Sequence, residues 1–320
     1  MTDSARIYAE LAILSADSME GRMTGSPGSA RAARWIASEM QRIGLTPSGD
    51  SSYFQRVPMV MASRGNGDAA RMRPTLAVSF QVLDTIAPER RVTGANVVGV
   101  ILGSDPALRD EAILIDAHYD HLGVGAPVKG DSIYNGTDDD ASGTIAVLEI
   151  ARALAAGPRP KRTVIFVATT GEEVGLLGTR WYIEHPVHPL DRTVANLEIE
   201  MIGRPDSLAG GRGRAWLTGY ERSTMGEMLA REGIPIVADA RPSEQFFMRS
   251  DNIAFAYVGI PAHTLSSYNM HTDYHTPADD MTLVDAGHMA KVIEAATHAV
   301  RSLANGAKPE WKPNGRPQRQ

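Results

Sequence analysis

The sequence predicts a single α/β domain with a mixed, mainly parallel central sheet and helices on both faces. Two short, continuous apolar runs, Ala112–Ala117 and Thr163–Thr169, are typical of central parallel strands, which are buried on both sides. Between them, apolar residues recur at helical spacing over Ser142–Ala156, and the pair Gly157 and Pro158 ends that helix. A strand, a helix and a second strand in this order make the crossover that parallel strands require.

The composition supports one folded domain and limits its chemistry. The chain has 320 residues, of which 43% are hydrophobic, so a substantial core is possible. Its net charge of −6 argues against a general nucleic-acid binder. No apolar run approaches the roughly 18 residues of a membrane-spanning helix. Because cysteine is absent, any metal must be held by histidine and carboxylate side chains.

The N-terminal part predicts helices followed by strands. The first 45 residues carry apolar positions at helical spacing on either side of a turn-rich segment, Glu20–Gly28. No charged segment followed by an apolar core occurs there, so we expect no signal peptide in the chain. Residues 62–74 contain two glycines, a proline and scattered charges, and predict a surface loop. Strand-like runs follow at Thr75–Leu83 and Ala95–Leu102.

The C-terminal part continues the alternation of strands and helices. Val194–Ile199 predicts a third strand and Phe255–Ile260 a fourth, and Thr282–Asn305 predicts a closing helix. The tail beyond it contains three prolines, which exclude regular structure: Pro309, Pro313 and Pro317.

Polar side chains directly follow three of these strands. His118 and His121 come after the first apolar run, Glu172 and Glu173 after the second, and Glu200 after the third. The carboxyl ends of parallel strands meet at one edge of a sheet, and ligands bind there. We therefore expect these side chains to gather in one site.

Three adjacent carboxylates, Asp138–Asp140, precede the predicted helix in the same region. Aspartate near a helix N-terminus often caps free backbone amides, which is the ordinary explanation for any one of them. Capping does not explain three crowded like charges, nor the adjacent pair Glu172 and Glu173. A bound divalent cation would offset that repulsion.

These segments resemble the co-catalytic zinc exopeptidases of metallopeptidase family 28, which include bacterial leucyl aminopeptidases and glutamate carboxypeptidase II. The matching blocks, in chain order, are Glu-Gly-Arg with Thr-Gly-Ser, Ala-His-Tyr-Asp-His, Asp-Asp-Ala-Ser-Gly, Gly-Glu-Glu with Gly-Leu-Leu-Gly, Met-Ile-Gly-Arg, Arg-Ser-Asp and Tyr-His-Thr-Pro-Ala-Asp. The resemblance covers roughly residues 5–300. It implies the zinc-exopeptidase, phosphorylase/hydrolase-like fold, with a catalytic domain over residues 1–305 and a proline-rich tail over 306–320.

The resemblance implies two zinc ions per chain and five ligands. His118 and Glu200 would hold one ion, Glu173 and His275 the other, and Asp139 would bridge them. Many relatives have aspartate in place of Glu200, so the native metal, whether zinc, cobalt or manganese, stays open. Glu198 lies two residues earlier on the same strand face and is a less favoured rival ligand.

The resemblance also implies roles around the metals. Glu172 would be the general base, and Asp120 would orient a ligand as an outer-shell carboxylate. Tyr274 would hydrogen-bond the tetrahedral intermediate, or simply pack. Arg249 would line the substrate cleft and bind a carbonyl or carboxylate, or else pair with Asp251.

The remaining histidines are expected to have other roles. We expect His121 to be hydrogen-bonded near the metal or on the surface, and His271 to lie in a loop without ligating. Five more are expected to pack or to face solvent: His185, His188, His263, His288 and His298. The substrate pocket is expected to draw on Phe246, Phe247, Met248 and Tyr268.

The leading functional prediction is a metal-dependent aminopeptidase that acts on peptides, with no nucleic-acid or membrane partner. The alternatives are a carboxypeptidase of the same family, a glutaminyl-cyclase-like transferase with one zinc, and a non-catalytic binding module. Relatives are mostly exported, so a periplasmic or secreted location is expected, with a cytoplasmic one left open. The oligomeric state is not predicted.

Overall fold

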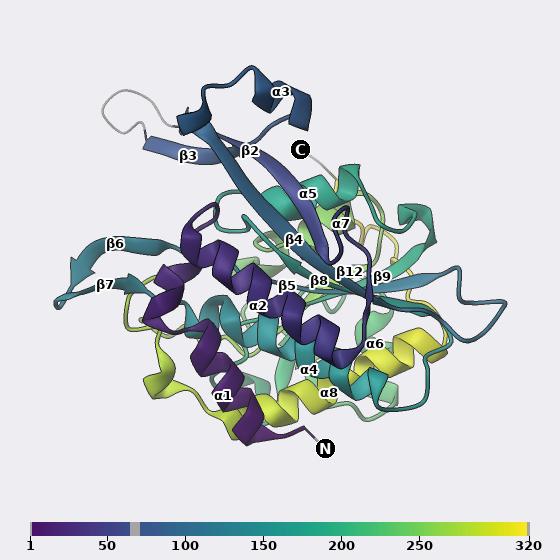
Figure 1. The fold of residues 1–320 in the computed structure, drawn as a ribbon. Coiled ribbons are helices and arrows are strands. Elements are labelled where there is room, and N and C mark those ends of the chain that lie inside the picture. Colours follow the sequence, from purple (N-terminus) through teal and green to yellow (C-terminus); the bar gives the residue numbers. More distant parts are fainter. Residues whose placement is uncertain (1, 65–70, 319–320) are drawn as a thin grey trace.

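The computed structural model describes residues 2–64 and 71–318 and shows a twisted sheet between layers of helices (Figure 1). Within those ranges the main sheet has ten strands: β1 (Thr46–Pro47), β2 (Phe54–Arg64), β3 (Arg71–Leu76), β4 (Arg91–Ile101), β5 (Ala112–His118), β8 (Thr163–Thr169), β9 (Thr193–Glu200), β10 (Ala215–Leu217), β11 (Ile236–Ala238) and β12 (Ala262–Ser266). A separate two-stranded ribbon, β6 (Gly123–Val128) with β7 (Asp131–Tyr134), projects from the body.

The sheet is parallel at its centre, antiparallel from β8 outward through β4, β2 and β3, and mixed at its other flank, where β10 is antiparallel to β12 and parallel to β11. Its order is β11-β10-β12-β9-β5-β8-β4-β2-β3, and β1 pairs with β4. The central strands β12, β9, β5 and β8 are mutually parallel, whereas β4 runs antiparallel to β8 and β10 antiparallel to β12. Every residue of β5 and β8 is buried. The predicted mixed α/β sheet is confirmed, and the parallel pairs β5–β8 and β5–β9 join strands that the apolar runs predicted.

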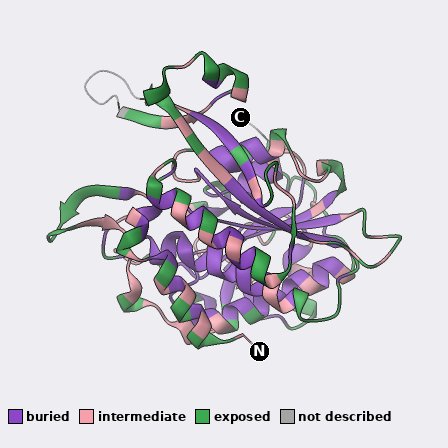
Figure 2. Cartoon of the chain, viewed as in Figure 1, coloured by how far each residue is buried: buried purple, intermediate pink, exposed green. Residues whose placement is uncertain are grey.

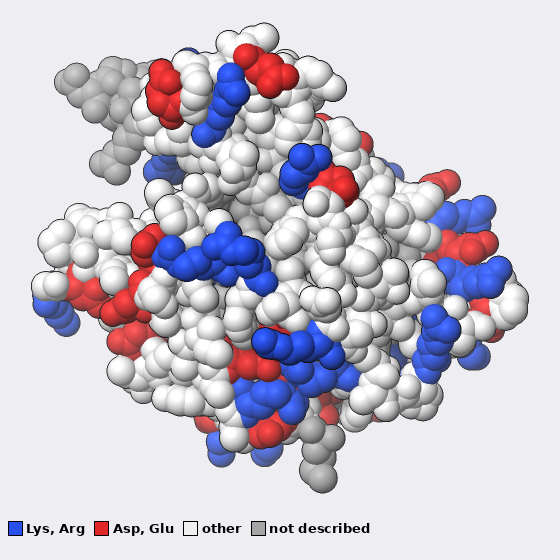
Figure 3. All heavy atoms as spheres, viewed as in Figure 1, with Lys and Arg blue, Asp and Glu red and all other residues white. Residues whose placement is uncertain are grey.

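Helices cover both faces of the sheet, as predicted. One face carries α1 (Ser4–Leu14), α2 (Pro27–Ile43), α4 (Gly143–Ala155) and α8 (Ala286–Asn305), and the other carries α5 (Leu177–Glu184) and α7 (Asn252–Tyr257). Alternate residues of β5 serve the two cores: Ile113 packs with the first group and Leu114 with the second. Figure 2 shows the buried sheet and the alternation of buried and exposed positions along α1 and α2. Acidic and basic side chains are interspersed on the face shown in Figure 3.

The prediction for residues 62–83 was largely wrong. Residues 62–64 belong to β2 and residues 71–76 to β3, so the expected loop is a strand pair; residues 65–70 lie outside the described part. Pro74 is compatible with β3 because β3 is an edge strand with a single partner. The expected strand beyond Leu76 is instead a helix, α3 (Phe80–Asp84), because the Ser79 side chain accepts a hydrogen bond from the Val82 amide and caps it.

The fourth predicted strand was also misplaced. The first half of Phe255–Ile260 lies in α7 and the second half in the turn that follows, and the strand begins only after Pro261, as β12. The cause is a tertiary contact. The carboxylate of Glu198 in β9 accepts hydrogen bonds from the backbone amides of Asp251 and Asn252, at 3.1 Å each, and so stabilises the first turn of α7. The closing helix starts at Ala286, a few residues later than predicted, and the Asp285 side chain caps it.

The tail after α8 packs against the body. Among its described residues, 306–318, no helix or strand forms, which agrees with the prolines. The indole of Trp311 donates a hydrogen bond to the Gly259 carbonyl at 2.9 Å, and Trp311 forms an isolated bridge with Ser223.

His263 of β12 is a buried structural histidine. It is 0% exposed; its Nδ1 lies 2.7 Å from the Thr218 carbonyl and its Nε2 2.6 Å from the Ser223 hydroxyl. Because a carbonyl can only accept, Nδ1 carries the proton and the serine donates to Nε2. Burial lowers the pKa of His263 to about 4.

We expect His263 to make the folded state less stable in acid. Between about pH 6.5 and pH 4 the unfolded chain binds a proton at this residue and the folded chain does not, so the free energy of unfolding falls as the pH falls, by up to about 3 kcal/mol. His263→Asn should lose this part of the pH dependence in urea unfolding measured between pH 7 and pH 4. The control is His298→Asn, at an exposed position of α8. Equal pH dependence in wild type and His263→Asn would show that His263 is not the source.

Candidate active site

The predicted ligands meet at the carboxyl edge of the central strands. His118 ends β5, Glu173 follows β8 and Glu200 ends β9, while Asp139 lies in the turn before α4 and His275 in the segment after β12. Two groups of side chains have potential ligand atoms within 4.8 Å of one another: His118, Asp139 and Glu200 form one, and His121, Asp139 and Glu173 form the other. Asp139 belongs to both.

The two oxygens of Asp139 face different histidines. Oδ1 lies 3.3 Å from Nε2 of His118, and Oδ2 lies 3.1 Å from Nε2 of His275. His275 Nε2 is also 3.3 Å from Oε1 of Glu173. The structure therefore brings together all five side chains that the resemblance named, with Asp139 in the middle.

His121 lies closer to the centre than expected. It is 1% exposed, so a surface position is wrong, and its Nδ1 is 2.9 Å from Oε1 of Glu173 and 3.7 Å from Oδ2 of Asp139. The signal that could have found it is its position three residues after His118, in the turn that leaves β5. His121 and His275 approach the same two carboxylates, and their rings meet edge to face with centroids 5.6 Å apart.

The donor set fits a bound cation. Buried atoms without a hydrogen-bond partner cluster here: Nε2 of His118, both ring nitrogens of His121, Oδ2 of Asp139, Oε1 of Glu173 and Nε2 of His275. Unsatisfied buried polar atoms are costly, and lone pairs that converge on one space are what a metal ligates. Imidazole nitrogens and carboxylate oxygens without thiolates suit zinc and similar divalent ions.

The pKa shifts of the site also indicate a place for a cation. Burial raises the pKa of Glu200 to about 8, with Glu198 adding to it, and burial raises the pKa of Glu172 well above its usual range. Burial opposes protonation of His275, but the nearby carboxylates of Asp139 and Glu173 raise its pKa to about 10. Neighbouring carboxylates raise all three pKa values, in addition to burial for the two glutamates, and this buried excess of negative charge attracts positive charge.

The other two members of the aspartate run have structural roles. Oδ1 of Asp138 accepts a hydrogen bond from the Gly203 amide at 2.7 Å. Oδ1 of Asp140 accepts from the amides of Gly143 and Met201, at 3.0 Å each. Capping therefore accounts for Asp140 at the start of α4, and both side chains tie that start to the turn after β9.

Asp279 and His271 support the same turn, and the sequence had assigned no role to Asp279. The Asp279 carboxylate accepts the backbone amides of Asp138 and Asp139, each at 3.0 Å. Nε2 of His271 lies 3.1 Å from Oδ2 of Asp138. The segment that carries His275 is thus joined to the turn that carries Asp139.

Asp120 acts through both its backbone and its side chain. Nδ1 of His118 is 3.1 Å from the Asp120 carbonyl oxygen and 3.9 Å from its carboxylate, so the carbonyl is the nearer partner of the ring. The carboxylate instead accepts from the Thr24 hydroxyl at 2.8 Å and from the Glu172 amide at 3.2 Å. Asp120 therefore holds His118 and Glu172 in one frame.

The structure distinguishes Glu198 from Glu200. Glu198 is 0% exposed, and its carboxylate accepts four hydrogen bonds, from Ser250 Oγ, Thr264 Oγ1 and the amides of Asp251 and Asn252. It forms a buried group with Asp116 and Asp251, apart from the two groups around Asp139. With its lone pairs occupied, Glu198 has a structural role, and Glu200 is the carboxylate that joins His118 and Asp139.

A pair of substitutions tests this distinction. Glu200→Gln should weaken metal binding by more than about 100-fold, since even outer-shell partners of ligands are worth about 10–100-fold. Glu198→Gln should leave metal content unchanged but lower the free energy of unfolding by about 2–3 kcal/mol, because it removes a charged acceptor. Chelator competition and urea unfolding measure the two effects. Metal loss in the Glu198 variant alone would reverse the assignment.

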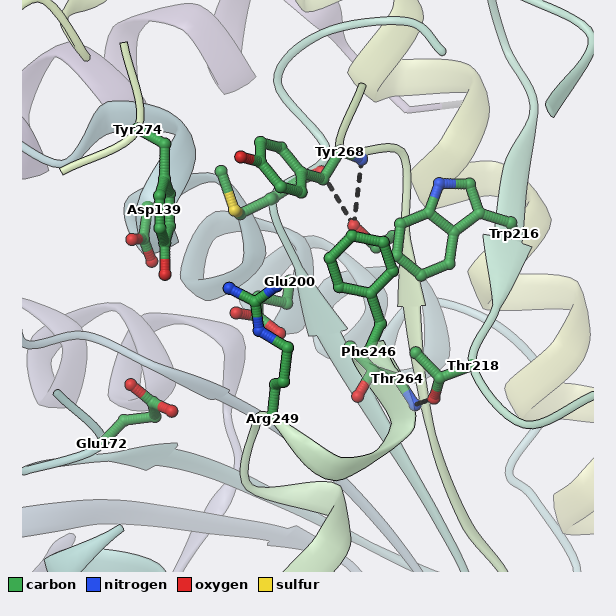
Figure 4. A pocket seen from close by; sticks show the side chains of 12 residues that line it. Asp139, Glu172, Glu200, Trp216, Thr218, Phe246, Arg249, Thr264, Tyr268 and Tyr274 are labelled. Carbon is green, nitrogen blue, oxygen red and sulfur yellow. Dashed lines mark hydrogen bonds between the residues drawn. The ribbon is translucent and has the colours of Figure 1, made fainter. Parts of the chain in front are cut away.

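A narrow pocket with a cavity volume of about 50 Å³ opens beside these groups. Figure 4 shows Glu172, Glu200, Asp139 and Tyr274 around it, with Phe246, Tyr268 and Trp216 forming an aromatic wall. The Tyr274 ring stacks on His275, with centroids 3.8 Å apart.

Some pocket predictions hold and others do not. Phe246 and Tyr268 line the pocket, whereas Phe247 and Met248 line a different one on the other side of Phe246. Arg249 lines the active-site pocket with its guanidinium 5.2 Å from the Phe246 ring centroid, and it is not the partner of Asp251, which accepts from the Thr169 hydroxyl. Sequence reasoning missed Met201 and Trp216, because residues of separate strands become neighbours only in the folded sheet.

The fold and the site together define a class of protein: an α/β protein whose mixed sheet carries a cluster of histidines and carboxylates, suited to binding metal, at its carboxyl edge. The model of peptidase family M28 matches residues 96–300. The chain belongs to this family.

Individual relatives are distant. The chain is 29% identical over 200 residues to a vacuolar membrane protease of Tuber melanosporum. The matched region covers 58% of this chain and 18% of that protein. It is 22% identical over 259 residues to Aminopeptidase YwaD of Bacillus subtilis, covering 76% of this chain and 51% of the relative. The chain thus spans about half or less of the length of these relatives.

Solved structures share the fold. A zinc aminopeptidase from Bacillus subtilis superposes with a TM-score of 0.67 at 15% identity, covering 99% of this chain and 98% of that one. A glutaminyl cyclase from Porphyromonas gingivalis superposes with a TM-score of 0.62 at 15% identity, covering 93% and 98%.

Proposed function

We propose that this protein is a zinc-dependent aminopeptidase with two metal ions that share Asp139. The observation that carries the proposal is the position of the Asp139 carboxylate, which directs one oxygen toward His118 and the other toward His275 and Glu173. A carboxylate between two sets of nitrogen and oxygen donors is suited to bridging two cations. Membership of family M28 and the zinc aminopeptidase among the solved structures support the same reading.

Each ion would be held by this chain's own side chains. His118, Glu200 and Asp139 would hold one, and Asp139, Glu173 and His275 the other, with His121 next to the second set. The chemistry that zinc supplies when bound is polarisation of a carbonyl group and acidification of a water molecule.

Glu172 is proposed to move the proton. It lines the pocket next to Asp139 and Glu200, and its backbone is held by Asp120. Burial raises the pKa of Glu172, so the side chain can take a proton from the attacking water and return it to the departing amine. The adjacent Glu173 faces the histidines instead, because consecutive side chains point in different directions.

Tyr274 and Arg249 are proposed to bind and orient the substrate. Both line the pocket, and both can donate hydrogen bonds to a peptide carbonyl. The carboxylates around Glu172 would attract the free ammonium of a peptide N-terminus.

The alternatives are less well supported by the pocket. A carboxypeptidase needs a cationic pocket for the substrate's C-terminus, and Arg249 is the single basic side chain among the described residues that line the pocket. A glutaminyl-cyclase-like transferase shares the fold, but it would need only one of the two groups around Asp139. A non-catalytic binding module would not need a complete donor set.

The cellular location remains a separate proposal. In the part of the chain that the structure describes, no helix is long and apolar enough to cross a membrane. We keep the periplasmic or secreted location as a prediction. The vacuolar membrane name belongs to relatives of which this chain covers less than a fifth.

The direction of cleavage tests the proposal most directly. Aminoacyl anilides and peptides with a free N-terminus should be hydrolysed, and acetylation of that amine should abolish turnover, because the acidic pocket would lose its charged partner. Release of free amino acids, followed by chromatography, is the measurement. Equal rates on free and acetylated peptides would count decisively against an aminopeptidase.

The number of ions is a second test. Two divalent ions per chain, of which zinc is the first choice, should remain after dialysis of unsupplemented protein, because both groups around Asp139 have full donor sets. Elemental analysis alongside activity measures this. Full activity with one tightly bound ion would refute the dinuclear centre.

Adjacent glutamates provide the third test. Glu172→Gln keeps the size of the side chain and removes the base, so kcat should fall about 10²–10⁴-fold while both metals stay bound. Glu173→Gln should instead lose metal, and excess zinc should partly restore its activity. Loss of metal from the Glu172 variant only would show that base and ligand are interchanged.

A further inference from the structure

Arg22 is a fully buried cation for which the proposed mechanism has no use. It is 0% exposed and lies at the end of the short helix Asp17–Arg22, in the Glu-Gly-Arg block near the N-terminus. A buried arginine is costly unless its donors are satisfied, so a structure retains one only where those donors do something specific.

The guanidinium of Arg22 binds the two turns that carry the proposed ligands. Nε donates to the carbonyl of Tyr119 at 2.7 Å, immediately after His118. Nη1 donates to the carbonyl of Asn135 at 2.6 Å, and Nη2 to that of Gly136 at 2.7 Å, just before Asp139.

Arg22 makes two further hydrogen bonds that join these turns to the N-terminal segment. Nη1 also donates to the Leu14 carbonyl at 2.9 Å, which anchors the guanidinium to the end of α1. The Arg22 carbonyl accepts the amide of His121 at 3.4 Å. The turn with His118 and His121 is therefore held from both the side chain and the backbone of one residue.

All four side-chain hydrogen bonds go to carbonyl oxygens, and none of the described carboxylates is a direct partner. Burial lowers the pKa of Arg22 to about 10, and the charges of Asp279, Asp120 and Asp139 oppose that shift. The residue thus places positive charge behind the acidic centre without occupying any of its carboxylate oxygens.

The backbone is held in an uncommon conformation to place this side chain. Glu20, Gly21 and Arg22 all have positive φ, at 51°, 61° and 50°. A Cβ at Gly21 would lie 2.5 Å from the carbonyl oxygens of Gly123 and Tyr134, so only glycine fits between the segment and the β6–β7 ribbon. Left-handed backbone at non-glycine residues is unfavourable and persists where surrounding contacts require it.

Thr24 extends the same segment to a third turn. Its hydroxyl donates to Oδ2 of Asp120 at 2.8 Å, and Oδ1 of Asp120 accepts the amide of Glu172. The five residues Glu20–Thr24 therefore contact the turns that carry His118 and Asp139 directly, and they reach the turn that carries Glu172 through Asp120.

We propose that Arg22, assisted by Thr24, is a positioning residue that sets the spacing between the two ligand-bearing turns before metal and substrate bind. Its effect on turnover rests on the proposed function, whereas its effect on metal affinity does not. Arginine suits this task because its planar fork of five donors can bind four carbonyls of three different segments at once, which a lysine ammonium cannot reproduce.

The test compares Arg22→Lys with a core variant that cannot act on the turns. Val300→Ala removes buried volume from α8 and serves as the control for lost stability. For both variants we would measure metal affinity by competition with a chromophoric chelator, kcat and KM at saturating zinc, and thermal unfolding.

We expect Arg22→Lys to bind metal at least about 10-fold more weakly, in the range found for outer-shell partners. It should also lose at least about 10-fold in kcat at saturating zinc, with KM changed much less. Val300→Ala should be destabilised while keeping wild-type metal affinity and kcat. If Arg22→Lys matches the control in both quantities, Arg22 only stabilises the fold and the proposal is wrong.

Thr24 keeps the proposal testable if Arg22→Lys does not fold. Thr24→Val removes the donor to Asp120 with little change in shape, and Thr24→Ser keeps it. We expect Thr24→Val to weaken metal binding and kcat, and Thr24→Ser to restore both. Wild-type metal affinity in Thr24→Val would overturn the proposal, whereas a wild-type protein that binds metal but cleaves no aminoacyl substrate would overturn the proposed function alone.

Discussion

The crowding of buried carboxylates at the carboxyl edge of the sheet is the constraint on which the rest of the structure depends. Asp120, Asp138, Asp139, Asp140 and Asp279 are all at most 2% exposed, and they come from three separate segments of the chain that meet in the fold. Such a set repels itself and loses its hydration, so each member needs donors from the protein or from a cation. The local backbone is arranged to supply the donors, and the centre is left for the cation.

Most of these carboxylates accept hydrogen bonds from backbone amides and hydroxyl groups. Asp138, Asp140 and Asp279 accept amides from neighbouring turns, and Asp120 accepts the Thr24 hydroxyl and the Glu172 amide. Because the donors come from other turns, each hydrogen bond also fixes one turn to the next. Asp139 is different, since its oxygens face histidines, and the proposal that two metal ions share this carboxylate depends on that difference.

The sheet was predictable where local pattern and tertiary environment agree. Thr163–Thr169 matches β8 because an unbroken apolar run suits a strand buried on both faces. The segment Phe255–Ile260 is also apolar, but the carboxylate of Glu198 accepts the amides of Asp251 and Asn252 just before it and so stabilises the helix that contains its first three residues. No periodicity in the segment itself carries that information, because the partner lies more than fifty residues away.

The sequence by itself determined the α/β class, the absence of thiolate chemistry and the residues that meet at the carboxyl edge, because residue type and the end of a strand are local properties. The resemblance had already named Asp139 within its run and favoured Glu200 over Glu198, and the tertiary structure shows the contacts that separate each from its neighbours. Only the tertiary structure placed His121 inside instead of on the surface. It also decided that Arg22 and Asp279 act on the site from distant segments. Orientation and long-range hydrogen bonding arise from packing, so they become visible only once the turns are placed side by side.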